Sequence, residues 1–174
     1  MTVITSNRWG FGIHSPFVYR LVTRVICGRL NPFRNRFPLP GNMCRREKRI
    51  TEVVVRMIEF FRPEEIHVVT GPGFLQSLIL EKYRNGTVFC REAKRDFERY
   101  TWFQIEYQRI SEEIEYRGNR VLILIDLKDA GTLGYFRELQ NDPGVTITIE
   151  VKNMGIVIIN PVYQKQNFYI RRWI

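Results

Sequence analysis

The sequence predicts an α/β fold with a mixed sheet. Three short apolar runs have the composition of strands, namely Ile66–Val69, Thr87–Cys90 and Val121–Ile125. Segments with helical character separate them, and this alternation is typical of a doubly wound parallel sheet. Two later apolar runs, Val145–Val151 and Ile156–Ile159, flank a Lys-Asn-Met-Gly turn and indicate an antiparallel hairpin. We expect this hairpin at one side of the three parallel strands.

Helical spacing and capping residues place the helices. Ser15 is a favourable N-cap and Pro16 suits the first helical position, so a helix is expected to Gly28, packed through Phe17, Leu21 and Val25. Other segments have helical spacing or charge: Arg49–Phe61, Phe74–Tyr83, Ala93–Ile110 and Gly134–Gln140. Phe168–Ile170 is expected to add a last strand.

Length and composition suit one compact unit. The 174 residues are 44% hydrophobic and 13% aromatic, which is enough to build a core. We expect residues 1–62 to form a basic N-terminal helical extension and residues 63–174 to form the α/β domain. The apolar runs are too short to span a membrane, and the N-terminus lacks the pattern of a signal peptide. Three widely spaced cysteines fit a cytoplasmic protein, and the two histidines offer no spacing for a metal site.

The positive charge lies in the N-terminal third. Residues 1–62 hold 12 Lys or Arg and three acids, which accounts for the whole net charge of +9. Such asymmetry fits a surface that contacts RNA or another polyanion, and equally a solvated face that keeps the chain soluble. Aromatic residues interleave with these arginines and could stack on bases or dock the segment onto the core. They are Trp9, Phe11, Phe17, Tyr19, Phe33 and Phe37.

The turn after the first predicted strand is the leading candidate for a ligand site. In doubly wound sheets, ligands bind beyond the carboxyl ends of the strands, near the first strand-to-helix turn. Gly71 and Gly73 flank Pro72 there, and glycines let backbone N–H groups approach a ligand closely. The alternative is a turn that simply needs glycine for its conformation.

Two acids follow the next predicted strands. Glu92 comes just after Thr87–Cys90, where a carboxylate can accept hydrogen bonds from both hydroxyls of a ribose. Asp126 ends the strongest buried run and can face the same crevice. The alternatives are a surface acid for Glu92 and a helix cap or loop acid for Asp126, with Asp129 as another candidate cap. No Ser/His/Asp or Cys/His combination is evident, so the residues predict no catalytic nucleophile.

Both ends of the chain resemble one protein family. Residues Arg8–Thr23, RWGFGIHSPFVYRLVT, resemble the HGIHSPFVF helix start of an uncharacterised group of bacterial class I S-adenosylmethionine (SAM)-dependent methyltransferases. Met154–Ile159, MGIVII, and Gln166–Arg171, QNFYIR, look like the MGIVFF and QHFTLR closing strands of that group. The intervening strands keep the family's order, so the resemblance covers most of the chain. It implies a truncated Rossmann-like methyltransferase fold with N-terminal helices.

The resemblance also implies roles for the four candidate residues. Gly71 and Gly73 would approach the methionine end of SAM, Glu92 would bind the ribose, and Asp126 would lie on the substrate side of the crevice. An active member would transfer the methyl group by direct displacement, with the protein mainly positioning the reactants.

The middle of the chain departs from the family pattern. Val68 stands where the family's ELGTSLG pattern has an acid, and the FIDGNH segment becomes LIDLKD, which keeps only Asp126 of its polar residues in register. Only 19 residues separate Ile125 from Val145, so the fifth strand of the family is expected to be missing. The resemblance therefore implies a methyltransferase-like protein with reduced or lost catalysis and weak or lost SAM binding. The alternatives are a non-catalytic module that contacts RNA or another polyanion through residues 1–62, and a protein-interaction scaffold.

Overall fold

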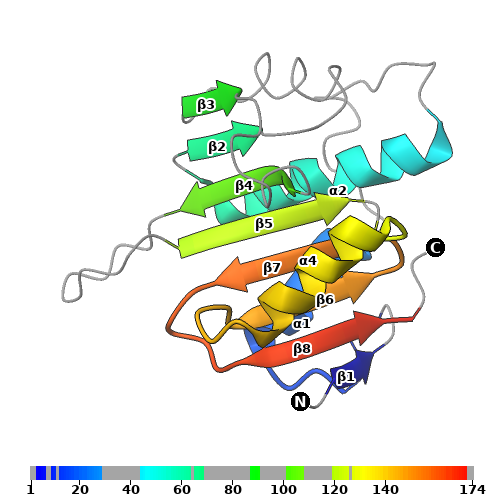
Figure 1. The fold of residues 1–174 in the computed structure, drawn as a ribbon, viewed down its shortest axis with the longest axis vertical. Coiled ribbons are helices and arrows are strands. Elements are labelled where there is room, and N and C mark those ends of the chain that lie inside the picture. Colours follow the sequence, from blue (N-terminus) through cyan, green and yellow to red (C-terminus); the bar gives the residue numbers. More distant parts are fainter. Residues whose placement is uncertain are drawn as a thin grey trace.

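A computed structural model describes residues 3–6, 9–10, 12–28, 44–63, 65–68, 87–90, 101–107, 119–125 and 127–171. The helices are α1 (Pro16–Arg20), which continues as the π-helix η1 (Leu21–Ile26), α2 (Arg45–Phe61) and α4 (Ala130–Asn141). The strands are β1 (Val3–Ser6), β2 (Glu65–Val68), β3 (Thr87–Cys90), β4 (Thr101–Tyr107), β5 (Asn119–Ile125), β6 (Ile147–Val151), β7 (Met154–Ile159) and β8 (Gln166–Ile170). Figure 1 shows their arrangement.

These strands form one open mixed sheet in the order β1-β8-β6-β7-β5-β4-β2-β3. β2 pairs with β3 in parallel, and β4 is antiparallel to both β2 and β5. β7 is likewise antiparallel to both β5 and β6, whereas β8 is parallel to β6 and to β1. It follows that β4 and β7 run against all the other strands of the sheet.

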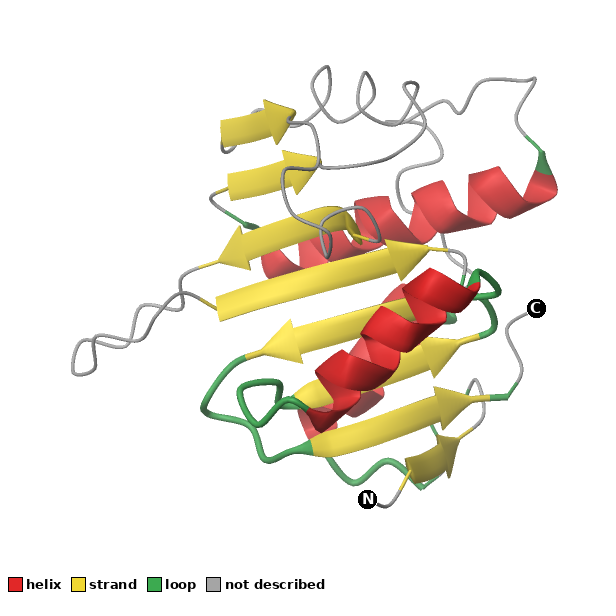
Figure 2. Cartoon of the chain, viewed as in Figure 1, coloured by secondary structure: helices red, strands yellow, loops and turns green. Residues whose placement is uncertain are grey.

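The helices make two layers, one on each face of the sheet. The helices α1, η1 and α2 lie on one face, and α4 crosses the other (Figures 1 and 2). The first layer packs through a cluster of buried aliphatic side chains that includes Leu21, Val54 and Met57 and reaches Ile123 of β5. The smaller cluster under α4 centres on Phe136 and Leu124. The N-terminal helices therefore share one continuous core with the C-terminal strands.

Local sequence explains how these helices begin and end. The Ser15 hydroxyl accepts a hydrogen bond from the backbone N–H of Val18 (3.4 Å), and Pro16 occupies the first helical position. Leu21 and Val25 are buried and Phe17 is half-buried, so the predicted packing face is confirmed. The predicted helices 49–61 and 134–140 are also confirmed, and both extend further than the sequence indicated.

One expectation for the sheet is corrected and another is confirmed. The charged segment Ala93–Ile110 was expected to be helical, but Thr101–Tyr107 within it forms strand β4. Its Thr, Trp, Phe, Ile and Tyr residues favour a strand, and the flanking charges obscured that preference. The C-terminal hairpin is confirmed as antiparallel β6 and β7, and it lies on one side of β5, β2 and β3, as expected. β8 and the unexpected strand β1 extend the sheet beyond it.

Other features agree with the sequence analysis. Between Leu127 and Thr146 the chain forms one helix and no strand. The predicted helix 74–83 lies outside the described residues. No helix within the described ranges has the length and apolar character needed to cross a membrane.

The contact between α4 and the sheet depends on one glycine. A Cβ atom on Gly155 of β7 would lie 2.6 Å from Cδ2 of Phe136, a fully buried ring of α4. Only a residue without a side chain lets this ring lie directly on the strand. The position fixes how closely α4 approaches β7.

We predict that Gly155→Ala destabilises the protein by about 1–3 kcal/mol, because the added methyl overpacks the Phe136 ring. Gly134→Ala is the matched control, since a Cβ on this exposed residue of α4 would have no neighbour within 4 Å. It should stabilise the protein by about 0.5–1 kcal/mol through helix propensity. Urea unfolding measures both changes, and equal stability of the Gly155→Ala variant and the parent would contradict the packing argument.

Candidate functional site

The strands before the predicted ligand residues all point to one edge of the sheet. Strands β2, β3 and β5 run in the same direction, and their carboxyl ends form the right-hand edge in Figure 1. Val68 at the end of β2 is level with Cys90 at the end of β3. Gly71 and Gly73 follow β2 in the sequence, Glu92 follows β3 and Asp126 follows β5. All four residues lie outside the described residues, so the structure places their strands and not their side chains.

Strand β4 changes the geometry of this edge. It lies between β2 and β5, pairing Phe103 with Val68 on one side and Thr101 with Leu124 on the other. The carboxyl ends of β2 and β5 are therefore two strand spacings apart, roughly 9–10 Å, instead of one spacing of about 4.8 Å. A ligand held by residues after both strands would have to bridge the start of β4.

Asp129, the alternative cap, begins helix α4 just after this edge. Its carboxylate accepts hydrogen bonds from the backbone N–H of Thr132 (2.8 Å) and from the Thr132 hydroxyl (3.0 Å). The backbone bond and then the hydroxyl bond lower the pKa of Asp129, because both stabilise the ionised carboxylate. Leu127 N–H also donates to the carbonyl of Asn153 (3.0 Å), which ties this loop to the β6–β7 turn.

A buried polar cluster lies beneath α4. The Thr148 hydroxyl donates to Oδ1 of Asn167 (2.7 Å) and accepts from Nε2 of Gln140 (3.3 Å). Arg137 donates to Oε1 of Gln140 (2.6 Å) and forms a 2.9 Å ion pair with Glu150. These side chains bind one another, so the cluster orients α4 on β6 and β8 and does not by itself point to a ligand.

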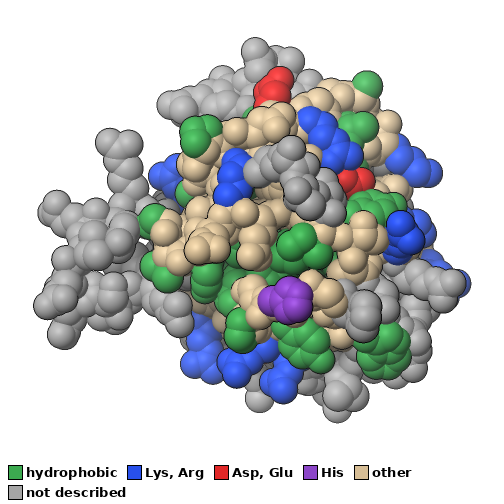
Figure 3. Space-filling view, turned by 90° about the horizontal axis from the view of Figure 1, so that it is seen from below, with side chains coloured by type: hydrophobic (Ala, Val, Ile, Leu, Met, Phe, Trp, Pro, Cys, Tyr) green, Lys and Arg blue, Asp and Glu red, His purple; other side chains and the backbone are tan. Residues whose placement is uncertain are grey.

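The helical layer on the other face presents the basic residues. Arg20, Arg24, Arg45 and Arg62 are exposed, while Lys48 and Arg49 are half-buried. Arg20 and Arg24 are four residues apart, so they lie on the same side of the α1–η1 helix. In the view from below, Lys and Arg side chains gather along the lower margin, and acids are few (Figure 3). The sequence showed that the excess positive charge lies in residues 1–62. The structure places the described basic residues of that segment on the layer formed by α1, η1 and α2.

Arg56 is the exception among these cations, because it is buried. Its Nε donates to the carbonyl of Val25 near the end of η1 (2.6 Å), and its Nη1 lies 3.9 Å from Glu52. Burial lowers the pKa of Arg56, and the nearby charges of Glu52 and Cys27 oppose that shift. This hydrogen bond joins η1 to α2 near the end of η1.

The remaining candidate residues are the histidines and cysteines, of which the structure describes some side chains. His14 is exposed, and the side chain of His67 lies outside the described residues. Cys27 is half-buried and Cys44 is exposed. No group of three or more His, Cys, Asp or Glu side chains that could hold a metal occurs among the side chains that the structure describes.

Comparisons with protein-family models, with curated proteins and with solved structures give no match to this chain. Functional inference therefore rests on the residues and on the geometry of the sheet edge and the helical layer.

We predict that Asp129→Ala lowers the melting temperature at pH 7 by removing the cap of α4. Because folding depresses the Asp129 pKa, its contribution is present above the ordinary carboxyl pKa and is lost as the pH falls through the lowered value. The gap between the parent and Asp129→Ala should therefore narrow in strong acid. Asp129→Asn, which keeps an acceptor but lacks the charge, should melt between Asp129→Ala and the parent at pH 7. An equal gap at both pH values would contradict the charged cap.

Proposed function

We propose that the protein is a methyltransferase-like domain with reduced or lost catalysis that binds SAM weakly or not at all. The proposal that a ligand can still bind at the carboxyl ends of the strands depends on one observation. Strands β2, β3 and β5 precede the four candidate residues, and all three end at the same side of the sheet. Glu92 follows the end of β3 closely in the sequence and would bind a ribose at this side of the sheet. Gly71 and Gly73 follow β2. This arrangement supports a truncated Rossmann-like interpretation of the fold.

Three features support weak binding. Val68 stands at the end of β2, where an acid would organise the glycine turn and accept hydrogen bonds from the cofactor. Pro72 removes one backbone N–H from that turn. Strand β4 separates β2, which precedes Gly71 in the sequence, from β5, which precedes Asp126. In an active member, SAM supplies the methyl group, and these residues would hold it by the methionine end and the ribose.

We predict that calorimetric titration with SAM or its demethylated product gives millimolar affinity or no heat. Losing one or two charge-assisted hydrogen bonds weakens a micromolar site by about one to four orders of magnitude. Any weak binding that remains should be lost in Glu92→Ala and kept in Glu138→Ala, which removes an exposed acid of α4. Low-micromolar binding by the parent that Glu92→Ala abolishes would contradict the reduced site and favour an active enzyme.

The helical layer favours a second candidate function. We propose that the layer formed by α1, η1 and α2 contacts RNA or another polyanion, independently of the sheet edge. The observation behind it is the set of exposed arginines on one layer, Arg20, Arg24, Arg45 and Arg62. Glu52 lies beside buried Arg56 and so does not offset them directly. Phosphate groups are the natural partners of such a surface.

We predict that a fluorescent 12-nucleotide oligouridine binds with an affinity that falls steeply as salt rises, because bound phosphates release counterions. The double variant Arg20→Gln/Arg24→Gln should weaken binding and make the logarithmic salt slope shallower by roughly 1 to 1.5, the value for two single-strand phosphate contacts. Lys128→Gln/Lys152→Gln removes the same charge from exposed residues elsewhere and should change little. No binding at low salt, or binding insensitive to salt, would exclude this function.

A further inference from the structure

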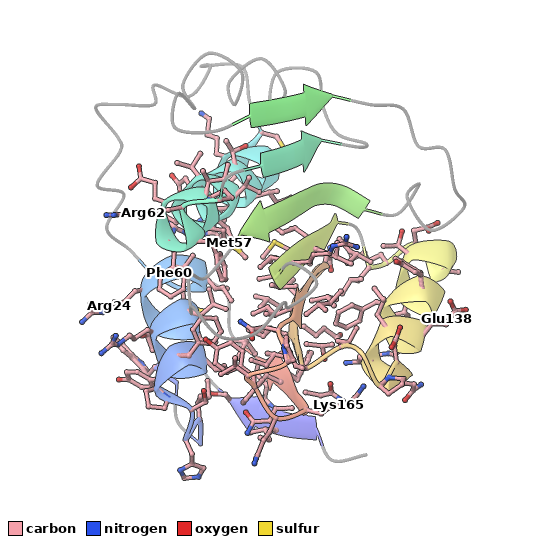
Figure 4. All side chains as sticks on the ribbon, turned by 90° about the vertical axis from the view of Figure 1, so that its left-hand side faces the viewer. Arg24, Met57, Phe60, Arg62, Glu138 and Lys165 are labelled. Carbon is pink, nitrogen blue, oxygen red and sulfur yellow. The ribbon has the colours of Figure 1, made fainter. Side chains whose placement is uncertain are left out.

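The helical layer that carries the exposed arginines also carries two exposed aromatic rings. Tyr19 is 46% exposed and Phe60 is 36% exposed, among the few large hydrophobic side chains that reach solvent. Arg24 and Arg62 project outward from this layer, and Phe60 lies between them in Figure 4. We call Tyr19, Arg20, Arg24, Phe60 and Arg62 the basic–aromatic face.

The Tyr19 ring is held in place from one side. Gly10 has φ +72°, and a Cβ on it would lie 2.6 Å from Cδ2 of Tyr19, so the glycine backbone packs closely against the ring. The following turn is closed by the N–H of Ile13, which donates to the Gly10 carbonyl (3.1 Å). The ring thus has a supported side and a solvent side, and little conformational entropy remains to be lost when a planar group stacks on it.

The Phe60 ring is also anchored. Its centroid lies 5.1 Å from that of Phe61 in an edge-to-face contact and 6.0 Å from that of Phe17. Phe17 in turn stacks on Tyr163 at 4.5 Å, which joins the end of α2 to α1 and to the β7–β8 loop. A cluster of this kind fixes the Phe60 ring while part of it stays exposed.

Rings placed among cations favour one kind of polyanion. Proteins that bind single-stranded nucleic acid combine a positive surface for the backbone with aromatic rings on which bases stack. In a duplex the base faces are stacked within the helix and cannot reach Tyr19 or Phe60. A polyanion without bases would contact the arginines but would have no planar group to stack on either ring. The exposed acid Glu59, next to Phe60 in the sequence, makes this end of the face less positive.

From this arrangement we infer that the basic–aromatic face binds single-stranded nucleic acid, with Tyr19 and Phe60 stacking on unpaired bases and Arg20, Arg24 and Arg62 contacting phosphates. This inference rests on the second proposed function, that the helical layer binds a polyanion. The inference adds the class of ligand, single-stranded nucleic acid, and the residues that would distinguish it from other polyanions.

The test compares a 12-nucleotide single-stranded RNA, the matching duplex and inorganic polyphosphate by fluorescence anisotropy or competition. We expect the single strand to bind at least tenfold more tightly than the duplex. Tyr19→Ala should weaken single-strand binding by about five- to hundredfold, the range for loss of one stacked base, and leave polyphosphate binding unchanged. Tyr19→Phe keeps the ring and should bind like the parent.

A second, more conservative variant tests the same role with less risk of disturbing the fold. Phe60→Leu keeps an apolar side chain against Phe17 and Phe61 but removes the stacking ring, and it should also weaken only single-strand binding. Thermal melting checks that each variant is folded. Equal affinity for single strand and duplex, or unchanged single-strand binding in both ring variants, would overturn the inference. If polyphosphate still bound in a salt-dependent way, the proposal that the layer binds a polyanion would remain. Failure of all three probes to bind would refute both.

Discussion

The burial of β5 between two helical layers is the constraint on which the rest of the structure depends. Val121 and Ile123 face the layer formed by η1 and α2, and Leu122 and Leu124 face α4. A strand that is apolar on both faces is stable only if both are covered, so α4 and the N-terminal helices are required together. β5 also pairs with both β4 and β7, and this double pairing fixes the direction of the strands on either side.

That requirement links the N-terminal basic residues to the sheet. The helices that carry Arg20, Arg24 and Arg62 are held down by their apolar sides, and Arg56 ties η1 to α2 through the Val25 carbonyl. This buried contact joins the two helices. The outward residues are displayed on a rigid layer, which is the condition for stacking and phosphate contacts to act together.

Much of the fold could be predicted from the sequence, because its strongest signals are local. The Ser15–Pro16 cap, the apolar run of β5 and the β6–β7 hairpin each carry a pattern that specifies their structure. Strand β4 was missed because the preference of Thr101–Tyr107 for a strand is realised by pairing with β2 and β5, far away in the sequence. Strand β1 was missed for a similar reason, since four residues acquire their structure only by pairing with β8.

Some of the candidate functional residues could likewise be predicted from local sequence, and others only from the structure. A charge pattern located the basic third, but only the structure shows that Arg56 is buried and that Tyr19 and Phe60 are exposed. Asp129 was considered as a cap from its position, and its hydrogen bonds to Thr132 confirm it. The predicted residues Gly71, Gly73, Glu92 and Asp126 remain predictions, supported by the directions of the strands that precede them.

The position of β4 decides whether β2 and β5 can share a methyltransferase-type crevice, and backbone NOE spectroscopy of residues 101–107 tests it most directly. The antiparallel register predicts cross-strand contacts between Gln104 and Leu122 and between Gln104 and His67. Finding both sets would establish that β4 separates β2 from β5. Helical contacts between residues three apart in this segment, or direct contacts between β2 and β5, would contradict the account.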